Sequence, residues 1–89
     1  MATTPKELSV HLEEAISGKK LNPILEQGLN SVIAQLRDGV DTNGNAVDYA
    51  AVRKTVLDLA GKAKVYGEGM ISRELKTAAK IIQVFQFTL

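Results

Sequence analysis

The second half of the chain, residues 48–89, reads DYAAVRKTVLDLAGKAKVYGEGMISRELKTAAKIIQVFQFTL and is the only long stretch with a sustained apolar period. Its apolar residues recur at spacings of three and four, which places them on one stripe of an α-helix. A first series ends at Met70, and a second begins at the next residue, Ile71. The first series comprises Tyr49, Val52, Val56, Leu59, Ala63, Tyr66 and Met70, and the second comprises Ile71, Leu75, Ala78, Ile82, Phe85 and Leu89.

The two series are out of phase, because Met70 and Ile71 are neighbours and lie about 100° apart around a helix. The change of phase coincides with Gly67-Glu68-Gly69, where two glycines cost about 2 kcal/mol of helix propensity relative to alanine. We expect one long helix over 48–89 whose contact face rotates at this weak point, because no proline interrupts the stretch. The alternative is two helices hinged at these glycines.

Two shorter helices are indicated ahead of this stretch. Thr4-Pro5-Lys6-Glu7 offers a capping threonine, a proline at the first helical position and a glutamate that completes a capping box, and Gly18 ends the helix. Asn22-Pro23 starts a second helix that runs to about Arg37, in which Gly28 indicates close approach of another helix. Their apolar faces comprise Leu8, Leu12, Ala15 and Ile16 in the first and Ile24, Leu25, Leu29, Val32, Ile33 and Leu36 in the second.

The expected fold class is all-α, a small bundle in which two shorter N-terminal helices pack on the C-terminal stretch within one domain, 1–89. The chain has no cysteine, which excludes disulfides, thiolate metal sites and cysteine nucleophiles. It has no run of about 20 apolar residues, so no membrane span is expected. The first residues lack the basic start and apolar core of a signal peptide. We therefore expect a cytoplasmic protein, with leaderless secretion left open.

The net charge of +1 argues against nucleic acid as the main partner, but the charge is unevenly distributed. Residues 1–45 hold four basic and six acidic side chains, whereas residues 46–89 hold seven and four. Such halves suit an antiparallel packing of one on the other, a head-to-tail oligomer, or two solvated faces without consequence. An accessory nucleic-acid-binding role would use the basic residues of the second half. Their spacing spreads them around the helix instead of along one stripe, and aromatic residues are not interleaved with them. These basic residues are Arg53, Lys54, Lys62, Lys64, Arg73, Lys76 and Lys80.

The sequence holds no recognisable catalytic constellation. The sole histidine, His11, has no obvious serine partner, and the acidic residues are scattered along polar helix faces. His11 and Glu14 lie three residues apart on a helix, but a third ligand is missing, so no metal is expected. No motif for nucleotides or flavins appears, and we expect neither a cofactor nor an enzymatic activity.

Residues 38–45 form the clearest loop, with Asn43-Gly44 as a turn signal and Asn45 as the expected cap of the next helix. The alternate spacing of Asp41, Asn43 and Asn45 is that of a calcium-binding loop. The rest of that motif fails, because Ala46 stands where it needs glycine and Val52 where it needs glutamate. We therefore expect a plain turn between helices.

The last nine residues, 81–89, hold six large apolar side chains and no charge. Left exposed, such a segment would be prone to aggregation, so we expect it to be covered by the chain's own core or by a subunit or partner protein. The predicted partner is another copy of the chain or another protein, and the predicted interface comprises Met70, Ile71, Leu75, Ala78, Ile82, Phe85, Phe87 and Leu89. These features predict a non-enzymatic protein-binding or self-assembling helical module.

The stretch from Leu36 to Met70, with Leu-Ala-Gly-Lys-Ala-Lys at 59–64, resembles small helical proteins encoded by phages and prophages. That resemblance implies a protein of the host cytoplasm that binds host proteins or assembles into particles. Two other pieces, 29–36 and 81–85, are similar to needle subunits of type III secretion systems, which are helical hairpins that build a filament. The chain departs from those subunits, because its turn lacks their proline pair and four residues follow Phe85.

Overall fold

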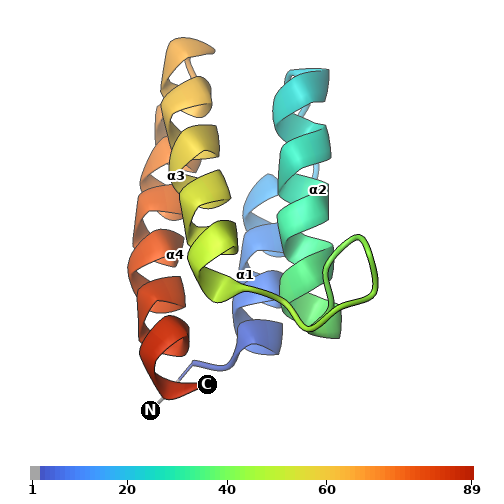
Figure 1. Cartoon of the computed structure of the whole chain (residues 1–89). Helices are drawn as coiled ribbons and strands as arrows, with labels where there is room; N and C mark the ends of the chain where they lie inside the picture. The colour runs from blue at the N-terminus through green and yellow to red at the C-terminus, as the bar shows by residue number, and fades with distance from the viewer. Residues whose placement is uncertain (1–2) are drawn as a thin grey trace.

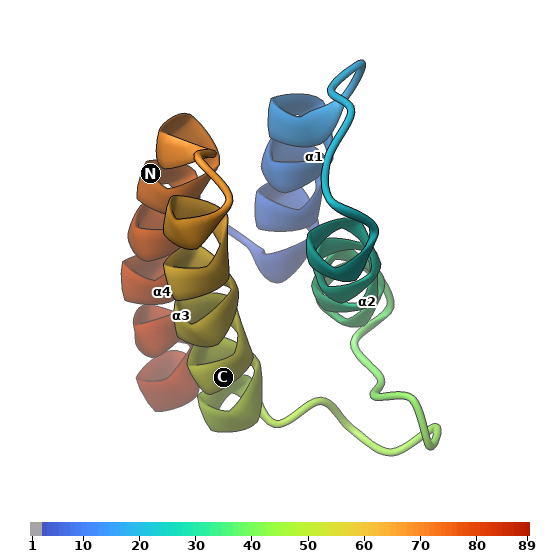
Figure 2. The same cartoon turned by 90° about the horizontal axis from the view of Figure 1, so that it is seen from above.

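The computed structural model describes residues 3–89, which form four helices and, within that range, no strand beyond an isolated bridge (Figure 1). The helices are α1 (Pro5–Ile16), α2 (Pro23–Asp38), α3 (Tyr49–Val65) and α4 (Gly69–Thr88). They run alternately up and down, so that each lies antiparallel to the one before it. The first two helices form one hairpin and the last two a second, and the hairpins pack side by side (Figure 2). The all-α bundle expected from the sequence is confirmed.

The starts of α1 and α2 follow the capping signals in the sequence. The Thr4 hydroxyl oxygen accepts a hydrogen bond from the Glu7 backbone N–H at 3.1 Å and donates one to the Glu7 carboxylate at 3.1 Å. The Asn22 side-chain oxygen accepts from the Ile24 backbone N–H at 2.9 Å. In both helices a proline follows the cap, where its missing N–H costs nothing.

The start of α3 differs from the expectation, because Asp48 and not Asn45 caps it. The Asp48 carboxylate accepts hydrogen bonds from the backbone N–H groups of Ala50 at 3.0 Å and Ala51 at 3.4 Å. Asn45 is engaged in the preceding loop, where its backbone N–H donates to the Asp41 carboxylate at 3.0 Å and its carbonyl accepts from the Asp41 N–H at 2.8 Å. These two hydrogen bonds close the loop, so Asn45 belongs to the loop and not to the start of α3.

The expectation of one continuous helix over 48–89 is wrong, and the hinged alternative is correct. Gly67 lies in the left-handed region with φ of +79°, a conformation that glycine adopts without steric cost. Its N–H donates to the Lys64 carbonyl at 3.2 Å, and the Glu68 N–H donates to the Ala63 carbonyl at 2.8 Å. This pair of bonds is a Schellman motif, which ends α3 and reverses the chain. Because α4 folds back, the two out-of-phase apolar series both face one core.

The core is a single cluster of buried apolar side chains drawn from all four helices. The helices approach closely at Gly28, where an added Cβ atom would lie 2.5 Å from Cδ2 of Leu59 on α3. The rings of Tyr49 and Phe85 pack edge to face with centroids 5.7 Å apart, which joins the start of α3 to the end of α4. The predicted Gly28 approach is thus confirmed.

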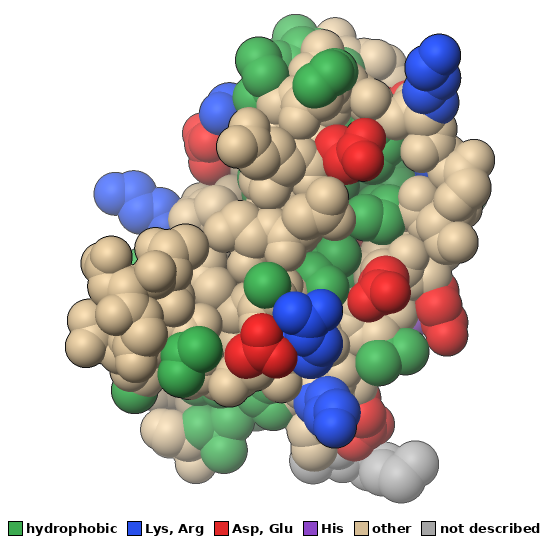
Figure 3. Space-filling model, turned by 90° about the vertical axis from the view of Figure 1, so that its right-hand side faces the viewer, with side chains coloured by type: hydrophobic (Ala, Val, Ile, Leu, Met, Phe, Trp, Pro, Cys, Tyr) green, Lys and Arg blue, Asp and Glu red, His purple; other side chains and the backbone are tan. Residues whose placement is uncertain are grey.

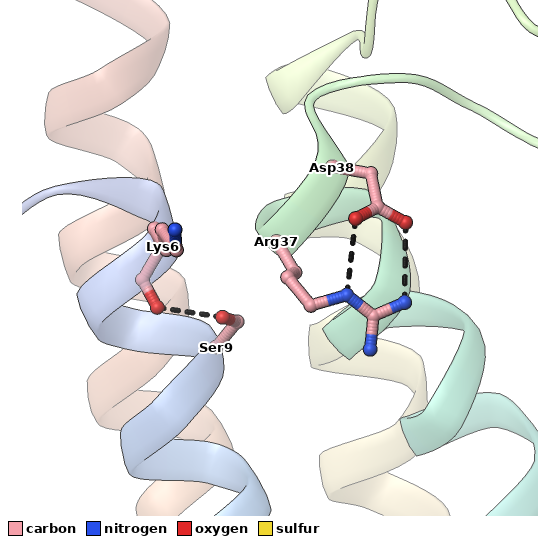
Figure 4. Close-up of polar contacts among 4 residues, drawn as sticks. All are labelled: Lys6, Ser9, Arg37 and Asp38. Carbon is pink, nitrogen blue, oxygen red and sulfur yellow. Dashed lines mark hydrogen bonds and ion pairs between the residues drawn. The ribbon is translucent and has the colours of Figure 1, made fainter.

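The hydroxyl of Ser9 lies inside this core without disturbing it. Ser9 is 1% exposed, and its hydroxyl donates to the Lys6 carbonyl one turn earlier in α1 at 2.6 Å (Figure 4). This local bond satisfies the buried polar group without a partner from another helix. The faces that α1 presents to α2 and α4 therefore pack as an apolar surface.

Candidate interaction surface

The structure divides the eight predicted interface residues into two groups. Five of them are at most 3% exposed and belong to the chain's own core: Ile71, Leu75, Ala78, Ile82 and Phe85. Because α4 folds back on α3, these side chains are already covered, and the prediction that they contact a partner is wrong. Met70, Phe87 and Leu89 are 71%, 76% and 71% exposed, so the interface prediction stays open for these three.

The exposed residues lie at opposite ends of α4 and form two separate clusters. Met70 lies beside Val65 and Tyr66 at the turn between α3 and α4. Phe87 lies in the last turn of α4, whose end is at the opposite end of the bundle from the α3–α4 turn (Figure 1). Met70 and Phe87 are 17 positions apart, which corresponds to about 25 Å of helix. The two clusters therefore lie at opposite ends of the bundle.

A groove of about 510 Å³, which we call the terminal groove, lies between the start of α1 and the end of α4. These two helices make the smallest of the four helix–helix contacts, so the bundle is least tightly closed here. No titratable side chain is among the residues that line the groove, which are Thr3, Thr4, Pro5, Ile81, Val84, Phe85, Thr88 and Leu89. The groove therefore suits an apolar side chain better than a charged ligand.

The solvent face of α4 carries a continuous row of exposed side chains at spacings of three and four. We call this row the α4 outer stripe, and it comprises Arg73, Lys76, Lys80, Val84 and Phe87. The expectation that the basic residues are spread around the helix is wrong for the three on α4, which lie on one face. No ion pair within residues 3–89 involves these three cations. The stripe is thus basic over its first half and apolar over its second.

Opposite charge does not hold the two halves of the chain together. Within residues 3–89 the one ion pair between the halves joins His11 Nε2 to Glu74 Oε2 at 3.0 Å, and its carboxylate comes from the basic half. Both side chains are substantially exposed, so the contact is a weak one. Figure 3 shows acidic, basic and apolar side chains interspersed on the face that carries α2. Apolar packing, and not charge, therefore joins the two hairpins.

Arg37 and Asp38 form a bidentate pair at the end of α2, with Nε to Oδ1 at 3.0 Å and Nη2 to Oδ2 at 3.1 Å (Figure 4). The hydrogen bonds from Arg37 lower the pKa of Asp38 below its usual value, and the same bonds raise the pKa of Arg37. Both groups face solvent, and the pair neutralises an acidic side chain at a helix end where negative charge is unfavourable.

No group of three His, Cys, Asp or Glu side chains within the described part of the chain is arranged to hold a metal ion. None of the four helices is both long and apolar enough to cross a bilayer, as judged over residues 3–89. Comparison of the chain with models of protein families, with curated proteins and with solved structures gave no match. The resemblances to phage-encoded helical proteins and to secretion needle subunits therefore stay predictions.

Sequence reasoning missed Val84, which is 57% exposed beside Phe87. A signal for it was present, because Val84 follows Lys80 by four residues and precedes Phe87 by three. The terminal groove had no such signal, because it exists only where the start of α1 meets the end of α4.

Proposed function

We propose that this chain is a non-enzymatic protein-binding module that assembles with further copies of itself through the end of α4. The observation that carries the proposal is the exposure of Val84 and Phe87, by 57% and 76%; Val84 also lines the terminal groove. Covering one phenylalanine side chain contributes about 2–3 kcal/mol. Aromatic side chains, phenylalanine among them, are enriched in protein interfaces.

The absence of charge from residues 81–89 supports a second copy as the occupant. Such a segment can enter an interface with another copy without the cost of removing one of its own side-chain charges from water. The non-enzymatic part of the proposal is supported by His11, which is 61% exposed and contacts Glu74 on an open helix face. A group that is to move protons in a reaction normally lies in a cleft that excludes water.

A second candidate is a subunit of a helical filament, of which a secretion needle is one example. The two exposed apolar clusters at opposite ends of the bundle favour it, because end-to-end contacts generate open chains. The two candidates differ in what forms at high concentration. A closed oligomer reaches a fixed mass, whereas a filament continues to grow.

The proposal is tested by the mass of the chain in solution, measured by light scattering over a wide range of concentration. We expect wild type to associate and Phe87→Ser to remain monomeric, with unchanged helix content by circular dichroism. Met70→Ser is the matched control, because Met70 is 71% exposed at the other end of the same helix. We expect it to associate like wild type. A wild-type chain that stays monomeric at every concentration would contradict the proposal, and loss of association in Met70→Ser alone would move the contact to the α3–α4 turn.

A further inference from the structure

The outer faces of α1 and α4, the two helices that close the bundle, carry charges of opposite sign. α1 holds three glutamates, Glu7, Glu13 and Glu14, and all three are exposed together with Val10, which is 50% exposed. We call these four residues the α1 outer face. Lys6 is the one basic side chain of this helix apart from His11. The α4 outer stripe holds three cations, and the one acidic residue of its helix, Glu74, is paired with His11.

These opposite charges do not meet within one molecule. Neither the three glutamates of α1 nor the three cations of α4 form an ion pair within residues 3–89. The contact between the two helices is the smallest in the bundle, and its one ion pair joins the histidine of α1 to the glutamate of α4. Within one molecule Glu7 accepts a hydrogen bond from the Thr4 hydroxyl and Glu13 interacts electrostatically with Arg37 of α2, but none of the three glutamates is paired with a cation of α4.

The apolar parts of the two surfaces match as well. The α1 outer face surrounds a hollow of about 260 Å³ lined by Val10, Glu13, Glu14 and Ser17, so an apolar side chain is flanked by carboxylates. The α4 outer stripe presents Phe87 and Val84, preceded by Lys80 and two further cations at intervals of about one turn. Each surface thus offers an apolar centre with charge beside it, and the signs of the charges are opposite.

We propose that the α4 outer stripe of one copy docks on the α1 outer face of the next, in a head-to-tail contact. This inference rests on the self-association proposed above and names the two surfaces that form it. A two-fold contact in which two α4 stripes run parallel, or antiparallel and centred near Lys80, would place these cations against those of the partner, and like charges across an interface are strongly unfavourable. Because the contact joins two different surfaces, it generates a ring or an open chain and not an isolated pair.

Charge reversal on each surface tests this contact. One variant carries Lys76→Glu and Lys80→Glu, and a second carries Glu13→Lys and Glu14→Lys. We expect each alone to associate at least about tenfold more weakly than wild type at low salt, because like charges then face each other. An equimolar mixture should associate again, because α1 of the first variant meets α4 of the second with native charges. A chain with all four substitutions should also recover association.

The matched control carries Lys54→Glu and Lys64→Glu, which change the net charge equally but lie exposed on α3. It should associate like wild type, and all variants should keep the wild-type helix content and melting temperature. Association of the α4 variant at wild-type strength, or a mixture that does not associate, would overturn the head-to-tail contact. The self-association itself would survive that result if it still depended on Phe87, whereas a monomeric wild type removes both.

Discussion

A Cβ atom on Gly28 would lie 2.5 Å from Cδ2 of Leu59, so a side chain at position 28 would force the end of the Leu59 side chain to shift. Leu59 is 4% exposed and fills the space that a side chain at position 28 would otherwise take. This contact joins the two hairpins, since α2 belongs to the first and α3 to the second. Gly28 therefore contributes to the packing of the two hairpins by leaving room for the Leu59 side chain.

Gly28→Ala should destabilise the fold although alanine favours helix. The overpacking cost of about 1–3 kcal/mol exceeds the gain of about 1 kcal/mol in helix propensity, so we expect a small net loss of unfolding free energy. Gly61→Ala on α3 is the control, because nothing lies within 4 Å of its added Cβ. Gly61→Ala should raise the unfolding free energy by about 1 kcal/mol. Urea unfolding of the two variants would show opposite shifts of the midpoint, and a gain in both would contradict the close approach.

Gly67→Ala should destabilise the turn between α3 and α4, because an alanine in the left-handed region costs about 1–2 kcal/mol. Gly69→Ala should be neutral or stabilising, since its backbone is not left-handed and its added Cβ meets nothing within 4 Å. Thermal unfolding of both variants checks the sign. A continuous helix in solution would be stabilised by both substitutions, so a rise in melting temperature for Gly67→Ala would count against the hairpin.

Asp48→Ala should lower the unfolding free energy by about 1 kcal/mol, because two N–H groups of the first turn of α3 lose their acceptor. Asn45→Ala should have little effect, since Asn45 serves the loop through its backbone N–H and carbonyl. Chemical denaturation of the two variants compares these effects directly. A larger loss of unfolding free energy in Asn45→Ala than in Asp48→Ala would show that Asn45 caps α3.

Ile82→Ala should lower the unfolding free energy by about 2–5 kcal/mol, because truncation of this fully buried side chain leaves a cavity in the hydrophobic core. Val84→Ala, two residues further on the same helix, should change stability by no more than about 0.5 kcal/mol in the monomer. The comparison is made at low concentration, where association does not contribute. Similar losses in the two variants would mean that Ile82 is not in the core.

The Arg37–Asp38 pair predicts that the unfolding free energy depends weakly on pH in the acid range. Asp38 has a lowered pKa in the folded chain, so its contribution to stability is complete above the unfolded pKa, near pH 4, and is lost as the pH falls through the folded value. The stability difference between wild type and Asp38→Asn should therefore shrink between about pH 5 and pH 2. Added salt should shrink it at neutral pH as well, because both groups face solvent. A difference that grows on acidification would contradict the lowered pKa.

Local signals were sufficient to predict the first half of the fold. Thr4-Pro5 and Asn22-Pro23 place the helix starts correctly because a cap and a proline act within one turn of each other. For the break at Gly67, the sequence predicted the position but not the direction of the chain after it. The change of phase marks the position, but whether the chain bends or reverses depends on a left-handed backbone and on what α4 then covers.

The candidate site was less predictable for the same reason. Whether Ile71 and Leu75 face their own core or a partner is decided by the direction in which α4 folds back, and the periodicity of α4 is the same in both cases. Charge counts over the two halves of the chain likewise did not reveal how charge is distributed over the outer faces of α1 and α4. The useful division is between the outer face of α1 and that of α4, which only the arrangement of the helices defines.

The terminal groove has a practical consequence for anyone who labels this protein. Thr3 and Leu89 both line it, so an affinity tag or fluorescent domain attached close to either residue would lie near this apolar surface. Such a fusion would mask self-association or create a false contact. A label in the exposed turn around Asn43-Gly44 leaves the groove open, and association experiments are best done with the label there.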